Sequence, residues 1–401
     1  MNTSTITRIS LNSLWLVLAR VFAQALSIIF TALVARRFGE TGLGQYAFIA
    51  AIIFLGNVFT TFGMDTLLIR DIARTRHPTT LLIPAALWIQ TILTVAFVGA
   101  IFLFGNPLAW LYSLSLFPLV LYTIYSATLR AFERMDLYLL INLASSILQA
   151  VSAVIVTIAP FDLTTLVVLL AASQVITTII AGTLCRRQVQ DFHLDWKISC
   201  AALVTIVHAA LPFALLTTLA IIYQRMGVFA LATFAGDNVT GWFSAAARVI
   251  EATKLAPQAV LGALFPILAR ASGDSANQLV RASQTTTLII GAVAFGVCVS
   301  FAQPIIGLIY GNRFEPSILA LQILASSLIP YTFTANISLK FVARGREWLV
   351  LRGTVIAVAI AVTLFAILVP RFGLLGACGA LVIAEWIQAS LFWRLNHYDH
   401  T

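Results

Sequence analysis

The chain has 401 residues, of which 60% are hydrophobic and 10% charged, and its mean hydropathy is +0.98. This balance excludes an ordinary soluble domain, in which about a quarter of the residues are charged. The net charge of +9 does not indicate nucleic acid, because the bases come in twos and threes between apolar runs, as in cytoplasmic membrane loops. The four cysteines show no CxxC spacing and predict neither a disulfide framework nor a zinc site. The composition predicts an all-α polytopic membrane protein.

Twelve apolar runs reach the length of about 20 residues that a membrane-spanning helix needs. The runs lie near 13–36, 44–69, 80–104, 108–130, 137–159, 163–184, 209–235, 241–267, 285–310, 317–341, 349–369 and 374–394. The first is too long for the core of a cleavable signal peptide, so we expect it to stay as an anchor. The longest polar joint follows the sixth run. We expect an N-terminal six-helix bundle at 1–184, a cytoplasmic linker at 185–208 and a C-terminal six-helix bundle at 209–401.

The positions of the Lys and Arg residues predict the orientation. With the N-terminus inside, sixteen of them lie in cytoplasmic segments and four in outer loops. This positive-inside bias places both termini in the cytoplasm and the chain in the cytoplasmic (inner) membrane of the cell. The remaining four bases lie within helices: Arg20, Arg225, Arg248 and Lys254.

The two halves of the sequence resemble each other. Gly39 and Gly44, after the first run, match Gly236 and Gly241, after the seventh, at the same spacing of five residues. Further correspondences follow in the same order and argue for a duplication. Each half has an even number of helices, so the pseudo-twofold axis runs along the membrane normal. Two pseudo-symmetric bundles around a central cavity suggest alternating access.

The eighth run carries a polar stripe. Arg248, Glu251 and Lys254 follow at steps of three and share one sector of the helix with Ser244 and Gln258. Each charge costs about 2.5–3.5 kcal/mol at the bilayer centre, so the stripe is expected to face protein or water rather than lipid. Either Arg248 and Glu251 form an i,i+3 pair that holds the helix to a neighbour, or the stripe lines a wet cavity. Lys254, as an unpaired third charge, favours the cavity.

Other polar residues also lie within the runs. Arg225 lies near the bilayer midplane by its distance from the helix end. Arg20 either belongs to the same cationic site or extends to the inner interface. Glu251 is the candidate for a coupling-ion site. Three other groups are interpreted as polar side chains satisfied between helices: Asp65, His208 and Glu385.

Common chemical motifs are absent from the sequence. It contains no Walker A loop, no GxGxxG, no HExxH and no EF-hand pattern, and it predicts no cofactor and no metal site. The outer loops offer few acids for chemistry on a glycan, which disfavours an enzyme such as a membrane glycan ligase or polymerase. We therefore expect no catalytic residues.

Four segments carry a family pattern: ARRFGETGLGQYA at 35–47, AGDNVTGWFSAAARVIEATKLAPQAVLGALFPILAR at 235–270, FVARGREW at 341–348 and LVPRFGLLGACGALVIAEW at 368–386. With these, the chain resembles the Wzx-type flippases of the multidrug/oligosaccharidyl-lipid/polysaccharide (MOP) exporter superfamily. The resemblance implies translocation of an undecaprenyl- or dolichyl-linked oligosaccharide through a central cavity, for a cell-surface polysaccharide such as O-antigen. It further implies a polysaccharide polymerase and glycosyltransferases as partners.

The resemblance also implies that basic residues on helices one, two, seven and eight meet the lipid diphosphate. The matching positions here are Arg20, Arg225, Arg248 and Lys254. The lipid II flippases of the superfamily have fourteen helices, whereas this chain has room for twelve. A multidrug or cation antiporter of the same superfamily is the alternative. Such exporters usually carry membrane acids in the first lobe, where this chain offers only Asp65.

Overall fold

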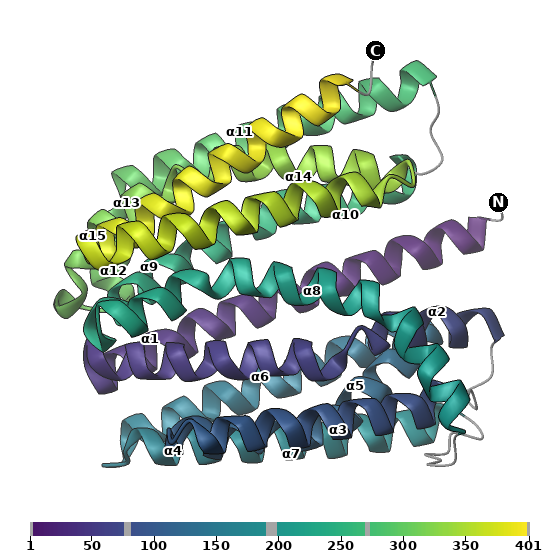
Figure 1. The fold of residues 1–401 in the computed structure, drawn as a ribbon, viewed down its shortest axis with the longest axis horizontal. Coiled ribbons are helices and arrows are strands. Elements are labelled where there is room, and N and C mark those ends of the chain that lie inside the picture. The colour runs from purple at the N-terminus through teal and green to yellow at the C-terminus, as the bar shows by residue number, and fades with distance from the viewer. Residues whose placement is uncertain (1–2, 76–81, 190–198, 269–272, 399–401) are drawn as a thin grey trace. The chain divides into compact units, whose positions relative to one another are not determined.

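The computed structural model describes residues 3–75, 82–189, 199–268 and 273–398 (Figure 1). Within these ranges the chain is helical and contains no strand. Nine helices of this described part are long and apolar enough to cross a membrane. The predicted class, an all-α polytopic membrane protein, is therefore confirmed.

The helices follow one another along the whole chain with short connections. In order they are α1 (Thr3–Thr61), α2 (Met64–Thr75), α3 (Leu82–Leu103), α4 (Pro107–Ser113), α5 (Leu116–Ala131), α6 (Met135–Ile158), α7 (Leu163–Gln188), α8 (Cys200–Phe234), α9 (Asp237–Thr253), α10 (Leu255–Leu268), α11 (Gly273–Ser300), α12 (Ala302–Ile309), the 3₁₀ helix η1 (Asn312–Phe314), α13 (Pro316–Ala325), α14 (Leu328–Ala343) and α15 (Glu347–Tyr398).

Two of the helices are kinked at a glycine. Gly39 in α1 has φ 69° and Gly373 in α15 has φ 51°, a region that glycine enters without the strain a side chain would add. The two elements are 59 and 52 residues long, and a single span needs about 20 residues. Each kinked helix is therefore long enough for two of the predicted runs. The total of twelve spans stays a prediction.

Four other predicted runs are each divided into two helices, and every break lies three residues before a proline. The breaks and their prolines are Ser115 with Pro118, Lys254 with Pro257, Phe301 with Pro304, and Ser327 with Pro330. Proline has no N–H to donate, and its ring clashes with the carbonyl four residues earlier, so the helix ends there and begins again. By contrast, α8 and α10 continue past Pro212 and Pro266.

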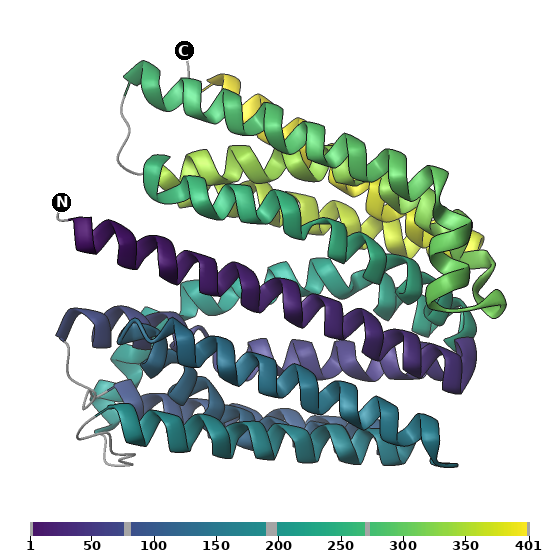
Figure 2. The ribbon, with the colours of Figure 1, turned by 180° about the vertical axis from the view of Figure 1, so that it is seen from behind.

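The chain packs into two compact units. Unit 1 comprises Met1–Phe30 and Ile49–Ile221, and unit 2 comprises Thr31–Phe48 and Ile222–Thr401. In unit 1, α7 packs against α5 and α6, and α2 and α3 pack against α5 (Figure 1). In unit 2, α15 packs against α14, α13 and α9, and α11 packs against α14 and α10 (Figure 2).

The boundary between the predicted halves is more helical than expected. Helix α7 continues to Gln188 and α8 begins at Cys200, so both ends of the predicted linker at 185–208 are helical. Residues 190–198 lie outside the described part of the chain. The division into bundles at 1–184 and 209–401 stays a prediction.

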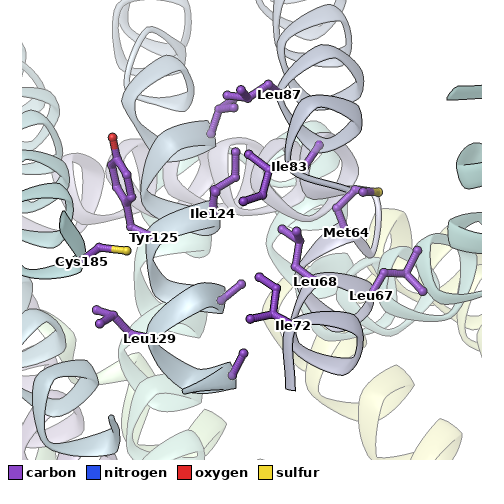
Figure 3. Packing of buried hydrophobic residues seen from close by; sticks show 14 of the residues in the cluster. Met64, Leu67, Leu68, Ile72, Ile83, Leu87, Ile124, Tyr125, Leu129 and Cys185 are labelled. Atoms are coloured by element: carbon purple, nitrogen blue, oxygen red, sulfur yellow. The ribbon is translucent and has the colours of Figure 1, made fainter. Parts of the chain in front are cut away.

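An apolar cluster holds the helices of unit 1 together. Figure 3 shows Met64, Leu68 and Ile72 of α2 facing Ile83 of α3 and Ile124 of α5, and all five side chains are at most 1% exposed. The steps of four residues place the three α2 side chains on one face of that helix.

The sequence interpretation of Asp65 is confirmed in the same unit. A guanidinium nitrogen of Arg130, on α5, lies 3.6 Å from the Asp65 carboxylate on α2. This contact joins two helices, as predicted for a polar group satisfied between helices. The side chain of His208, interpreted in the same way, is exposed.

The two repeated glycine motifs meet in unit 2. A methyl group on Gly44 would lie 1.8 Å from the carbonyl oxygen of Asp237, and one on Gly241 would lie 2.0 Å from that of Glu40. Nearby, Gln45 Nε2 donates a hydrogen bond of 2.9 Å to Asp237 Oδ2. The matched glycines of the sequence repeat therefore let two backbones approach more closely than any side chain would permit.

Candidate functional site

Charged side chains of α8 and α9 converge on one carboxylate in unit 2. Arg225 Nη1, from α8, lies 3.1 Å from Glu251 Oε1, and Arg248 Nη1, from α9, lies 3.0 Å from Glu251 Oε2. Each carboxylate oxygen therefore accepts a hydrogen bond from a different guanidinium group. The side chains are 21%, 24% and 26% exposed, so none of them is sealed within the protein. We call Arg225, Arg248 and Glu251 the charged triad.

Helix α9 has the geometry that the sequence predicted. Arg248 and Glu251 are one step of three apart and share a face, while the neighbouring Val249 and Ile250 are buried. Arg225 lies nine residues before the end of α8, which is about 14 Å at 1.5 Å per residue. The pairing of Arg248 with Glu251 was one of two open interpretations. The structure shows that pair and adds Arg225 to it.

Lys254 belongs to a second polar cluster in unit 2. Its Nζ lies 3.7 Å from Glu385 Oε1 on α15 and 4.3 Å from the ring centroid of Tyr331 on α14. Gln258 Nε2 donates a hydrogen bond of 2.9 Å to the Tyr331 hydroxyl. Lys254 is also the C-cap residue of α9, at the break before Pro257. The break before Pro257 therefore places Lys254 at the C-terminal end of α9.

The interpretation of Lys254 as an unpaired charge is therefore wrong. Its partner, Glu385, lies on a helix far along the sequence, and no local spacing could have indicated it. The interpretation of Glu385 as a polar group satisfied between helices is confirmed. The sequence reasoning did not find Tyr331, because an aromatic residue in an apolar helix gives no signal of a bound cation.

The charges of the two clusters do not cancel. Three bases, Arg225, Arg248 and Lys254, face two acids, Glu251 and Glu385, which leaves an excess of one positive charge. Glu251 is the acid of the predicted polar stripe, and Glu385 on α15 supplies the second. A guanidinium group has five N–H donors and binds carboxylate or phosphate oxygens in a planar fork. The excess charge and these donors suit an anionic ligand.

The fourth predicted base is in a different part of the chain. Arg20 lies in the segment of α1 that belongs to unit 1, and its side chain is exposed. The structure brings Arg225, Arg248 and Glu251 together and places Lys254 next to Glu385. A shared site for Arg20 and these residues stays a prediction. The described residues contain no group of three or more His, Cys, Asp or Glu that could hold a metal ion.

Solved structures of membrane transporters share this fold. An inward-facing multidrug resistance MATE family transporter of the MOP superfamily matches with a TM-score of 0.73 and 17% identity, over 94% of each chain. The lipid II flippase MurJ, in an inward closed conformation, matches with a TM-score of 0.74 and 15% identity, over 94% of this chain and 86% of that one. The fold is therefore that of the MOP-superfamily transporters.

The sequence matches a narrower family. The family model described as polysaccharide biosynthesis protein matches residues 10–272, more than half of the chain, and the chain belongs to this family. A relative from Haloferax volcanii, "Probable low-salt glycan biosynthesis flippase Agl15", is 28% identical over 173 residues. That match covers 42% of this chain and 37% of the relative, so the chain spans little more than a third of that protein's length.

Proposed function

We propose that the chain is a flippase that moves a polyprenyl-diphosphate-linked oligosaccharide across the membrane for the synthesis of a cell-surface polysaccharide. The observation that carries the proposal is the charged triad, in which two arginines from different membrane helices converge on one point. Membership of the polysaccharide biosynthesis protein family supports a glycan as the cargo. The names of the matched Agl15 and MurJ proteins support flipping as the activity.

A lipid diphosphate matches the chemistry of these side chains. Arginine holds phosphate oxygens in a fork, and lysine binds them as a point charge. A partly dehydrated site strengthens both interactions relative to water. We propose Arg225, Arg248 and Lys254 as the residues that bind the diphosphate, with Arg20 as a fourth. The polyprenyl tail stays in lipid while the sugars cross, and no covalent bond changes, so transport needs no catalytic residue.

The cellular setting follows from the same proposal. The excess of basic residues in alternate loops supports the cytoplasmic (inner) membrane as the location and the cytoplasm as the side of both termini. The oligosaccharide has to be assembled before it is flipped and polymerised or transferred afterwards. We therefore propose glycosyltransferases and a polysaccharide polymerase as functional partners.

A multidrug or cation antiporter is the second candidate function. It is supported by the MATE fold and by two acids in membrane helices, with Glu251 as the coupling carboxylate. Each acid, however, already has a basic partner: Glu251 binds two arginines and Glu385 lies near Lys254. A cationic substrate would have to displace those bases. The excess of bases over acids favours the flippase.

Flipping in proteoliposomes tests the proposal. With a polyprenyl-diphosphate oligosaccharide in the bilayer, Arg225→Ala or Arg248→Ala should slow flipping about tenfold or more, because a hydrogen bond to a charged group contributes about 1.5–3 kcal/mol. Arg225→Lys keeps the charge and should retain more activity. Arg371→Ala, at an exposed arginine beside the α15 kink, is the control and should flip normally. Export of cationic dyes, with no movement of the lipid-linked sugar, would overturn the assignment.

A further inference from the structure

The anion-binding groups of the charged triad are already bound to an anion of the protein itself. One oxygen of Glu251 accepts from Arg225 and the other from Arg248, at 3.1 and 3.0 Å. A diphosphate that uses both arginines must therefore displace this carboxylate or bind beside it against charge repulsion. In either case the carboxylate weakens the binding of the ligand.

The two contacts of Glu251 differ in kind. Arg248 lies one turn before Glu251 on α9, so these two side chains stay close whatever the neighbouring helices do. Arg225 comes from α8, so its contact with Glu251 joins two helices. An anionic ligand that replaces Glu251 would take over this link between α8 and α9.

The other acid in the region is not suited to such an exchange. The side chain of Glu385 is only 7% exposed, and a buried carboxylate that loses its basic partner is strongly destabilising. The side chain of Glu251 is 26% exposed, so water can solvate its carboxylate after displacement. Glu251 is therefore the acid that can leave its partners.

We propose that Glu251 is an internal counter-ion that competes with the anionic head group of the substrate for Arg225 and Arg248. This inference rests on the proposed flippase function and assigns a residue that sets substrate affinity. A transporter has to release its cargo as well as bind it. The carboxylate returns to the arginines as the diphosphate leaves, so both guanidinium groups again have an acidic partner.

The experiment measures the binding of inorganic pyrophosphate to the full-length protein in lipid nanodiscs by calorimetry. Glu251→Gln removes the negative charge and should tighten binding roughly tenfold to a hundredfold, because unit charges a few ångströms apart at a protein surface interact by several kcal/mol. Glu251→Asp keeps the charge and should stay within about threefold of the wild type. Glu251→Ala should tighten binding as Gln does, so that one poorly folded variant does not decide the result.

Two results overturn the inference in different ways. If the wild type binds pyrophosphate through Arg225 and Arg248, but both neutral variants bind equally or more weakly, then Glu251 only positions the arginines and the flippase proposal stands. If neither the wild type nor the neutral variants bind pyrophosphate in a manner that depends on the arginines, the anion site itself is absent. The proposed function then fails together with this inference.

Discussion

At the scale of the residue, the ammonium group of Lys254 is held by two partners of different kinds. Glu385 Oε1 lies 3.7 Å away and supplies the opposite charge, while the Tyr331 ring, with its centroid at 4.3 Å, offers its negative face. A buried ion pair contributes little compared with apolar side chains of the same size, but the loss of one partner alone costs about 3–5 kcal/mol. We therefore expect the loss of either charge to destabilise the protein strongly as long as the other charge remains.

A double-mutant cycle on this pair tests that dependence. Lys254→Met and Glu385→Gln alone should each lower the thermal unfolding midpoint in detergent. Lys254→Met should have the larger effect, because it leaves the carboxylate of Glu385, whose side chain is only 7% exposed, without its basic partner. The double variant should recover most of the loss, with a coupling of about 1–3 kcal/mol as expected for contacting residues. Losses that simply add would show that the two side chains do not stabilise each other.

The same residues show what sequence reasoning can reach. The shared face of Arg248 and Glu251 was predicted correctly, because steps of three on a helix are a local property. Their partners from other helices were not. Arg225 was recognised as a deep base but not as a ligand of Glu251, and Glu385 was not connected with Lys254. Those contacts depend on how the helices pack against one another, and helix packing cannot be inferred from the spacing of residues along a single helix.

At the scale of the element, glycine and proline positions determine where the helices of this chain end. The breaks before Pro257, Pro304 and Pro330 follow from the missing N–H of proline. The break between α1 and α2 contains no proline. There Phe62 and Gly63 have φ values of 50° and 67°, and a phenylalanine gives no sign of such a conformation. The run predicted at 44–69 therefore ends earlier than expected.

The glycine contact in unit 2 gives the prediction at this scale. Gly44→Ala and Gly241→Ala each place a methyl group about 2 Å from a backbone carbonyl oxygen, so the two backbones must separate. We expect each to destabilise the protein by about 1–3 kcal/mol or more, as overpacking does, measured as thermal unfolding in detergent. Gly296→Ala in α11 is the matched control, because a methyl group there meets nothing within 4 Å.

The control variant, Gly296→Ala, should leave the stability unchanged or raise it, since alanine is more favourable than glycine within a helix by about 1 kcal/mol. Equal stability of Gly44→Ala and Gly296→Ala would mean that the two motifs do not need their close contact. The pairing of the repeated motifs would then be a consequence of the duplication without a role in holding unit 2 together.

At the scale of the whole molecule, the class and family were predictable, because hydropathy and the distribution of charge are sums over the chain. The number of membrane spans is harder to predict from the sequence, since α1 and α15 each continue through a glycine kink. The count of Lys and Arg residues on each side of the membrane also includes side chains that stabilise the fold by contacts of their own. Arg36, one of four bases assigned to the outer side, donates from Nε to the carbonyl oxygen of Ile309 at the end of α12, 3.0 Å away. A base at a helix C-terminus is favourable in itself.

Labelling of single cysteines tests the orientation directly. In a background without the four native cysteines, Asp162→Cys and Asn312→Cys should react with a membrane-impermeant thiol reagent added outside intact cells. Gln188→Cys should react only after permeabilisation. All three side chains are exposed, so a difference in reactivity reports the side of the membrane and not burial in the protein. Outside labelling of Gln188 alone would reverse the predicted orientation.

The same assay decides whether a kinked helix crosses the membrane once or twice. In the predicted orientation Asn312 lies on the outer side, α13 and α14 carry the chain inward, and α15 begins at Glu347. If α15 turns at Gly373 and returns, His397→Cys is protected from the reagent in intact cells; if it crosses once, His397→Cys reacts like Asn312→Cys. At 52 residues, α15 would be about 78 Å long as one straight helix, more than twice the hydrocarbon thickness of about 30 Å. We therefore expect His397→Cys to be protected, which is the result that twelve spans require.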